Sequence, residues 1–315
     1  MIGVDALFSL NVEGDAGGED SQVQSLWFYQ TSGGLPSKEY YEEKPILDLY
    51  TSVVADVLVD IASHVKDSQD QEKRDIISDI VAEAVEVEQS GWPWPWPGDD
   101  KPKPPPGGDL PDNKTKEGAL EIRMERLAAK VVHFERELMR AGTDPEYLFN
   151  PHYAYNPYAT DEVDKHLPII DLRSYLSTFN VRQFPANITV TYPPYLKSVS
   201  KLVADTPDYV LSGYFATRLA FSYSSALGPK VATKEATKRL GDALKGIKKG
   251  TEENRQDTCL AAVDDVVGYI AGREYVREAF SAEAKEDGTK IINGESSPTD
   301  RESLADPLRN RRCLL

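Results

Sequence analysis

Apolar and polar residues alternate near the start of the chain, and apolar residues recur at helical spacing over most of the remainder. Every second residue from Ala6 to Val12 is apolar, and a second apolar run covers residues 23–29. Glycines and acids at 14–18 separate the two runs, so this region predicts a β-hairpin. A further short strand is predicted at 188–191, which reads Ile-Thr-Val-Thr.

The clearest helix has apolar residues at alternating spacings of four and three, which is the period of a helix with one buried face. These residues are Leu120, Met124, Leu127, Val131, Phe134 and Leu138. Gly142 is expected to end this helix. Comparable spacings predict helices over 50–65, 76–85 and 172–176, from 195 onward, and over 207–227, 231–249, 252–271 and 272–292.

The helix expected after Pro207 carries one further pattern, because four of its residues share a single face: Leu211, Phe215, Leu219 and Ser222. Taken together, the patterns predict a mainly α fold class. The chain is expected to form a multi-helix domain with a small N-terminal β-hairpin and a Pro/Trp-rich surface insertion.

The insertion covers residues 91–112, where Trp-Pro occurs three times and a Pro/Gly/Asp/Lys stretch follows. Proline has no amide donor and fixes its own φ, so this segment is predicted to be a polyproline-like or disordered surface segment. It could serve as a ligand for an aromatic-lined groove. A tolerated loop between two helices is the favoured interpretation.

The formal net charge of −16 argues against a nucleic-acid partner, which would need a basic stripe. The basic run from Lys230 to Lys249 has its charges at helical spacing and is interpreted as a solvated helix face. No segment approaches the roughly 18 to 20 apolar residues of a membrane span, so no transmembrane segment is expected. The first residues lack the basic region of a signal peptide.

A zinc hydrolase motif would place two histidines one helical turn apart with a Glu between them. The chain has four histidines, and no two lie within five residues of each other: His64, His133, His152 and His166. His64 and His133 are interpreted as packing residues. Serine-nucleophile and phosphate-loop motifs are absent as well. The sequence therefore predicts no catalytic, metal-binding or cofactor-binding residue.

Three residues outside these motifs have a possible chemical role. Asn113 and Asn187 each begin an Asn-x-Thr triplet and are possible glycosylation sites if the protein is secreted. Cys259 shares a helix face with Val263 and Ile270, so it is predicted to be a core residue and not a reactive thiol.

Three stretches resemble the neprilysin and endothelin-converting-enzyme family of zinc metallopeptidases. Residues 34–41, Gly-Leu-Pro-Ser-Lys-Glu-Tyr-Tyr, look like the family's Gly-Leu-Pro-Ser-x-x-Tyr-Tyr element. Residues 192–196 resemble its Pro-x-Tyr-Leu element, and residues 272–280 resemble its Gly-Arg-x-Tyr-Val-x-x-Ala-Phe stretch. The three occur in family order. The resemblance implies the family's N-terminal, mainly helical domain over 1–293, and residues 294–315 are expected to form a disordered tail outside the family pattern.

The resemblance also implies where the chemistry of the whole enzyme resides. The family holds its zinc in a C-terminal domain with a His-Glu-x-x-His motif, which does not occur in this sequence. The chain is therefore expected to be a fragment that is inactive alone, with that catalytic domain as its partner and small peptides as the substrates. A truncated gene model, a splice form or a degenerate copy would explain it.

Two further expectations follow from the family. Members are membrane-anchored with an extracellular or lumenal ectodomain, or secreted, although this chain shows no anchor. Cys259 matches a family cysteine whose partner lies upstream of Met1, so its thiol is expected to be unpaired. The alternative function is a non-catalytic helical interaction protein derived from the family.

Overall fold

The computed structural model describes residues 4–15, 24–66, 116–179, 184–228, 230–247 and 255–292. The helix predicted at 76–85, the insertion 91–112, Asn113 and the tail 294–315 lie outside these residues. The chain divides into two compact units, residues 1–249 and residues 250–315. The described part is mainly helical with one small sheet, so the predicted fold class is confirmed.

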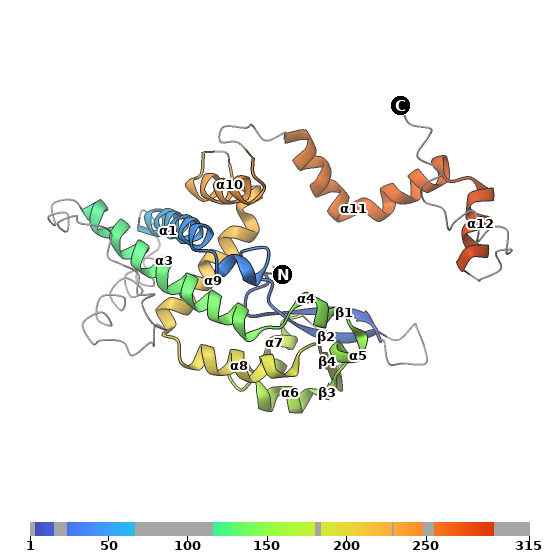
Figure 1. Cartoon of the computed structure of the whole chain (residues 1–315), viewed down its shortest axis with the longest axis horizontal. Coiled ribbons are helices and arrows are strands. Elements are labelled where there is room, and N and C mark those ends of the chain that lie inside the picture. Colours follow the sequence, from blue (N-terminus) through green and yellow to red (C-terminus); the bar gives the residue numbers. More distant parts are fainter. Residues whose placement is uncertain are drawn as a thin grey trace. The chain divides into compact units, whose positions relative to one another are not determined.

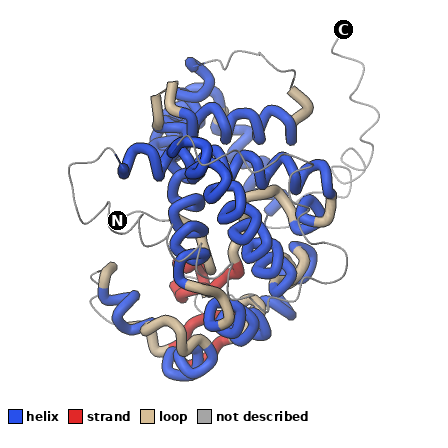
Figure 2. Tube along the Cα trace, turned by 90° about the vertical axis from the view of Figure 1, so that its left-hand side faces the viewer, coloured by secondary structure: helices blue, strands red, loops and turns tan. Residues whose placement is uncertain are grey.

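The sheet has four strands in the order β1-β2-β4-β3 (Figure 1). Strands β1 (Phe8–Gly14) and β2 (Gln24–Gln30) form the predicted antiparallel hairpin, and β4 (Asn187–Val190) is the predicted later strand. β4 runs parallel to β2, and β3 (Pro157–Ala159) adds antiparallel to β4. The strands lie together among the helices (Figure 2).

Helices α1 (Lys44–Lys66), α3 (Lys116–Ala141), α8 (Pro193–Ala204) and α9 (Asp208–Tyr223) form most of the core of the first unit. The stripe predicted for α3 is buried from Met124 to Leu138, and the helix ends one residue before Gly142. The ring of Phe134 contacts that of Tyr214 from α9, with centroids 5.0 Å apart. Helical periodicity therefore located the central helix of the fold correctly.

Shorter elements lie between these helices and strands along the chain. They are η1 (Lys38–Tyr41), α4 (Pro145–Leu148), α5 (Pro151–Ala154), α6 (Thr160–His166), α7 (Leu172–Ser177) and η2 (Ser224–Ala226). The basic run forms α10 (Ala232–Leu244), where Arg239 pairs with Asp56 of α1 at 2.8 Å. No helix among the described residues is long and apolar enough to cross a bilayer.

Helix α9 buries a different face from the one that its large apolar residues mark. Phe215 and Leu219 are 43% and 46% exposed. The buried face instead carries Tyr209, Tyr214 and Arg218. Because this face mixes hydroxyl and guanidinium groups with apolar surface, hydrophobicity alone does not reveal it.

The second unit contains α11 (Arg255–Ala279) and α12 (Ala282–Ile292). Two helices were predicted for 252–292 with a break at Gly272, but α11 continues through that glycine. The apolar side chains of α11 are widely exposed: Leu260, Val263, Val266, Val267, Tyr269, Ile270, Tyr275 and Val276. Cys259 is exposed as well. Its predicted core position is therefore wrong, because no described element of this unit covers that face of α11.

Candidate functional site

The histidines lie on four separate helices. His64 of α1 is exposed, and its Nδ1 lies 2.8 Å from the Asp60 carbonyl, so its interpretation as a packing residue is wrong. His133 of α3 is half-buried, and burial lowers its pKa. His152 is exposed on α5, and His166 ends α6. Among the described residues, no group of three or more His, Cys, Asp or Glu could hold a metal ion, so these residues do not fit a zinc site.

The two other described residues of interest, Asn187 and Cys259, belong to different units. Asn187 is exposed at the first position of β4, opposite Ala159 in the register. Cys259 lies on α11 in the other unit. Glycosylation of Asn187 stays a prediction.

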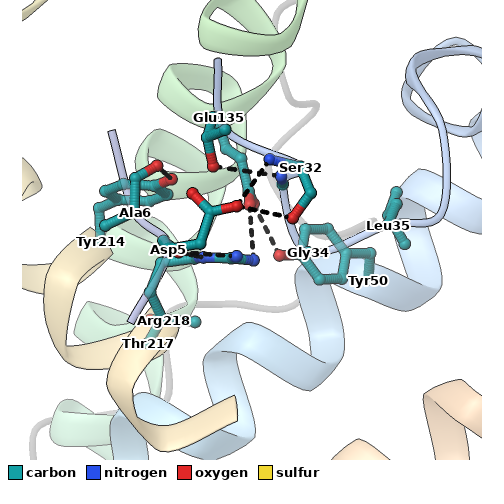
Figure 3. Close-up of polar contacts among 12 residues, drawn as sticks. Asp5, Ala6, Ser32, Gly34, Leu35, Tyr50, Glu135, Tyr214, Thr217 and Arg218 are labelled. Atoms are coloured by element: carbon teal, nitrogen blue, oxygen red, sulfur yellow. Dashed lines mark hydrogen bonds and ion pairs between the residues drawn. The ribbon is translucent and has the colours of Figure 1, made fainter. Parts of the chain in front are cut away.

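The most unusual chemical arrangement is a buried polar cluster around Glu135 of α3, whose side chain is 1% exposed (Figure 3). The Tyr50 hydroxyl, from α1, donates to Glu135 Oε2 at 2.6 Å. Arg218 Nη1, from α9, lies 3.6 Å from Glu135 Oε1. Three helices therefore bring an acid, a phenol and a guanidinium together in the interior.

The same cluster holds the segment that precedes β1. Arg218 donates from Nε and Nη2 to the Asp5 carbonyl at 3.0 and 2.8 Å. The Tyr214 hydroxyl donates to the Ala6 carbonyl, and the Tyr195 hydroxyl donates to the Leu7 carbonyl, each at 2.7 Å. Three consecutive backbone carbonyls thus receive their donors from buried side chains of α8 and α9, outside the β-ladder.

The loop at 31–35 completes the cluster. Gly33 has φ of +70°, a left-handed conformation that favours glycine. The amides of Gly34 and Leu35 donate to the Tyr41 hydroxyl at 3.0 and 3.1 Å. A Cβ on Gly34 would overlap the Tyr50 hydroxyl, so the loop packs directly on the cluster.

Burial controls the electrostatics of the cluster. It raises the pKa of the Glu135 carboxyl, while Arg218, the hydroxyls of Tyr50 and Tyr41 and the Gly34 amide act in the opposite sense. Burial also raises the pKa of Tyr50 far above its ordinary range, so this phenol is a permanent donor. Burial alone would lower the pKa of Arg218, but its neighbours raise it overall, so the guanidinium is charged.

A second ionic group lies at the surface of α3. Arg136 and Arg140 both donate to the Glu42 carboxylate, at 2.5 Å for Arg136 and at 2.8 and 2.9 Å for Arg140. These hydrogen bonds lower the pKa of Glu42 to about 2. They fasten the end of η1 to α3.

The sequence matches the family model of peptidase family M13 over residues 113–294, more than half of the chain. The chain belongs to peptidase family M13. M13 is a family of neprilysin-like zinc metallopeptidases, and this chain corresponds to the N-terminal domain of its members. The resemblance found in the three sequence motifs is therefore confirmed.

Curated relatives of the chain share modest sequence identity with it. An endothelin-converting enzyme homolog of Locusta migratoria is 27% identical over 186 residues, 56% of this chain and 25% of the relative. Neprilysin-1 of Caenorhabditis elegans is 25% identical over 171 residues, 52% of this chain and 22% of the relative. The chain thus spans about a quarter of the length of the curated relatives it matches.

Solved structures share the fold over nearly the whole chain. The zinc metalloprotease Zmp1 of Mycobacterium tuberculosis, in its open state, gives a TM-score of 0.61 at 17% identity, covering 92% of this chain and 36% of Zmp1. PepO of Lactobacillus rhamnosis HN001 gives a TM-score of 0.58 at 14% identity, covering 92% of this chain and 37% of PepO.

In this M13 chain, the Gly-Leu-Pro-Ser-x-x-Tyr-Tyr stretch has a structural role. Gly34 and Tyr41 contact the Glu135 cluster, and Leu35 is buried. The sequence singled out this stretch but did not predict its partners Glu135 and Arg218. One signal was available for Glu135, because it lies four residues after Val131 and three before Leu138, on the apolar face of the best-defined helix.

Proposed function

We propose that this M13 chain is the N-terminal, substrate-cavity domain of a neprilysin-like zinc metalloendopeptidase, with residues 1–293 forming the family domain. The whole enzyme hydrolyses internal bonds in small peptides. This chain contributes a wall of the cavity and leaves zinc binding and bond cleavage to the catalytic domain. Without that domain, it has no peptidase activity.

Membership of M13 is the single observation that carries this proposal. The polar cluster in the first unit fits the role of a structural domain, because Arg218, Tyr214 and Tyr195 hold the carbonyls of residues 5–7 in place.

The exposed apolar side of α11 supports a catalytic-domain partner. Val266 and Ile270 are 82% and 67% exposed, and Tyr269 is 99% exposed. Contiguous exposed apolar patches on a protein surface mark interaction sites. We assign this side of α11 to the interface with the zinc-binding domain.

The proposed lack of peptidase activity is tested by incubating the purified chain and added zinc with a quenched fluorescent peptide library. No hydrolysis is expected. Hydrolysis that a chelator abolishes, at a rate proportional to the amount of chain over successive purification steps, would contradict the proposal.

The context of the chain is tested by long-read sequencing of its transcript. An in-frame His-Glu-x-x-His downstream of codon 292 is expected, because the zinc site belongs to the same parent protein. A stop codon in every transcript, together with the absence of hydrolysis, would instead support a non-catalytic interaction protein derived from the family.

A further inference from the structure

Glu135 is the acid at the centre of the buried cluster, with its side chain 1% exposed, whereas Asp5 is only half-buried. An uncompensated charge in the interior is costly, and a buried group usually changes its protonation state to avoid that cost. The cation beside Glu135, Arg218, directs its hydrogen bonds to the Asp5 carbonyl and not to the carboxyl. The geometry of the cluster therefore favours a proton on Glu135.

Two carboxyl oxygens point to where that proton resides. Glu135 Oε1 and Asp5 Oδ1 are both buried and have no hydrogen-bond partner among the described residues. Asp5 Oδ2 already accepts two hydrogen bonds, from the Ser32 amide at 3.0 Å and the Ser32 hydroxyl at 2.9 Å. Glu135 is the more deeply buried of the two acids, and Tyr50 donates to its other oxygen, Oε2. A proton on Glu135 would therefore remove the more costly of the two charges.

Arg218 stands between two competing acceptors. Its Nε and Nη2 bind the Asp5 carbonyl at hydrogen-bond distance, whereas its Nη1 remains 3.6 Å from Glu135 Oε1, beyond hydrogen-bond reach. A neutral Glu135 leaves the guanidinium with the carbonyl. An ionised Glu135 would attract the guanidinium strongly, because two opposite charges at short range attract each other more than a charge and a carbonyl dipole do.

We propose that Glu135 carries a proton in the folded chain, and that loss of this proton draws Arg218 away from the Asp5 carbonyl. The cluster then acts as a pH-dependent latch on residues 5–7 and on the loop at 31–35. Protonated, it holds both segments. Deprotonated, with the proton released to solvent, it loosens them.

The groups around Glu135 agree with this assignment from each packed element. Tyr50 from α1 and Tyr41 from η1 are phenols whose pKa burial raises, so they stay neutral donors. Tyr214 from α9 is likewise neutral, and Arg218 is the cation that interacts with the carboxyl. Apart from Asp5 of the N-terminal segment, the groups packed around Glu135 are therefore neutral donors and one cation.

The latch is tested by hydrogen exchange of the full chain, read by mass spectrometry in the peptides that contain residues 5–8 and 31–35. Exchange rates are divided by intrinsic rates, which removes the direct effect of pH. Protection is expected to fall as pH rises, by roughly tenfold for each unit by which folding raises the Glu135 pKa. In Glu135→Gln, which cannot ionise, protection in these peptides should not depend on pH.

A matched control and a second readout complete the test. Glu137→Gln changes a carboxyl two residues further along α3 that pairs with Arg140 at the surface, and its exchange profile should match the wild type. Infrared spectra of the wild type should show the carbonyl band of a protonated carboxyl at neutral pH, which is lost over the same pH range as the protection. This wild-type comparison decides the question even if Glu135→Gln does not fold. A wild type with every carboxyl ionised at neutral pH, or a protection profile that Glu135→Gln leaves unchanged, would overturn the latch.

Discussion

The hydroxyl of Tyr50 and the carboxyl of Glu135 lie 85 positions apart in sequence and share a 2.6 Å hydrogen bond between α1 and α3. Both side chains are buried almost completely. The pair forms the centre of the polar cluster, and most contacts of that cluster are to backbone groups. Its contribution to stability can be measured one atom at a time.

Removing the Tyr50 hydroxyl should destabilise the fold. Tyr50→Phe leaves Glu135 Oε2 buried without its donor, and such a loss costs about 1 to 3 kcal/mol. Urea unfolding measures the change. Tyr153→Phe is the control, because Tyr153 is 53% exposed and should change the free energy of unfolding by less than about 0.5 kcal/mol. Equal effects of the two substitutions would show that the cluster hydrogen bond contributes nothing.

Adding one methyl group at Gly34 should be more damaging than its size suggests. Gly34→Ala places a Cβ against the Tyr50 hydroxyl and 3.2 Å from Glu135 Oε1, and overpacking of this kind costs about 1 to 3 kcal/mol or more. Gly241→Ala is the matched control, since nothing lies within 4 Å of a Cβ there and α10 is helical. It should stabilise the chain by up to about 1 kcal/mol. Thermal melts of both variants give the comparison, and a destabilised Gly241→Ala would contradict it.

Sequence reasoning recovered the elements whose signal is local. The α3 stripe, the β1–β2 hairpin and the β4 strand each repeat a short period, so their residues could be recognised without knowing their neighbours. Strand β3 has three residues and owes its existence to pairing with β4, which no local pattern reveals.

The cluster was missed for a different reason. Arg218 and Tyr214 carry polar groups, so in sequence they resemble surface residues. Their hydrogen-bond acceptors, the carbonyls of Asp5 and Ala6, lie 213 and 208 positions away, and no local pattern reveals them. The face of α11 that carries Cys259 was misassigned for a related cause. Apolar residues mark a buried face only when another element covers them, and Val266 is 82% exposed.

The Glu42 carboxylate should make stability depend on acid pH. Its pKa is lowered to about 2 in the folded chain by hydrogen bonds from Arg136 and Arg140. A carboxyl whose pKa is lowered by folding stabilises the fold at pH values above its pKa in the unfolded chain, about 4.3. This stabilisation is lost as pH falls toward 2. Because Glu42 is 47% exposed, the contribution should remain below about 1 kcal/mol. The difference in unfolding free energy between wild type and Glu42→Gln should therefore be present at neutral pH and vanish near pH 2. A constant difference across that range would rule out the ionic origin.

The chain should associate through α11 when salt screens its charge. The net charge of −16 opposes contact between copies, and that repulsion is confined to about 10 Å at 0.1 M salt. Light scattering over a salt series should show growing particles for the wild type. Val266→Lys with Ile270→Lys should abolish the growth, because it places charges on the apolar side. The control variant, Ala261→Lys with Ala271→Lys, adds the same charge at exposed small residues of the same helix. It should not abolish the growth. Growth in both double variants would locate the association elsewhere.

The parallel pairing of β2 with β4 also affects the chain during its synthesis on the ribosome. Thr191 donates to the Phe28 carbonyl across 163 positions, and β2 contacts β4 along the neighbouring residues. At about 5 to 20 residues per second, synthesis leaves β2 waiting for β4 for on the order of ten to thirty seconds. During that interval the hairpin presents an open strand edge, the kind of template that recruits other chains. A nascent chain of this protein is thus most vulnerable to aggregation after β2 and before β4 has been made, so slow decoding between residues 31 and 190 should be harmful and chaperone binding in that interval should help.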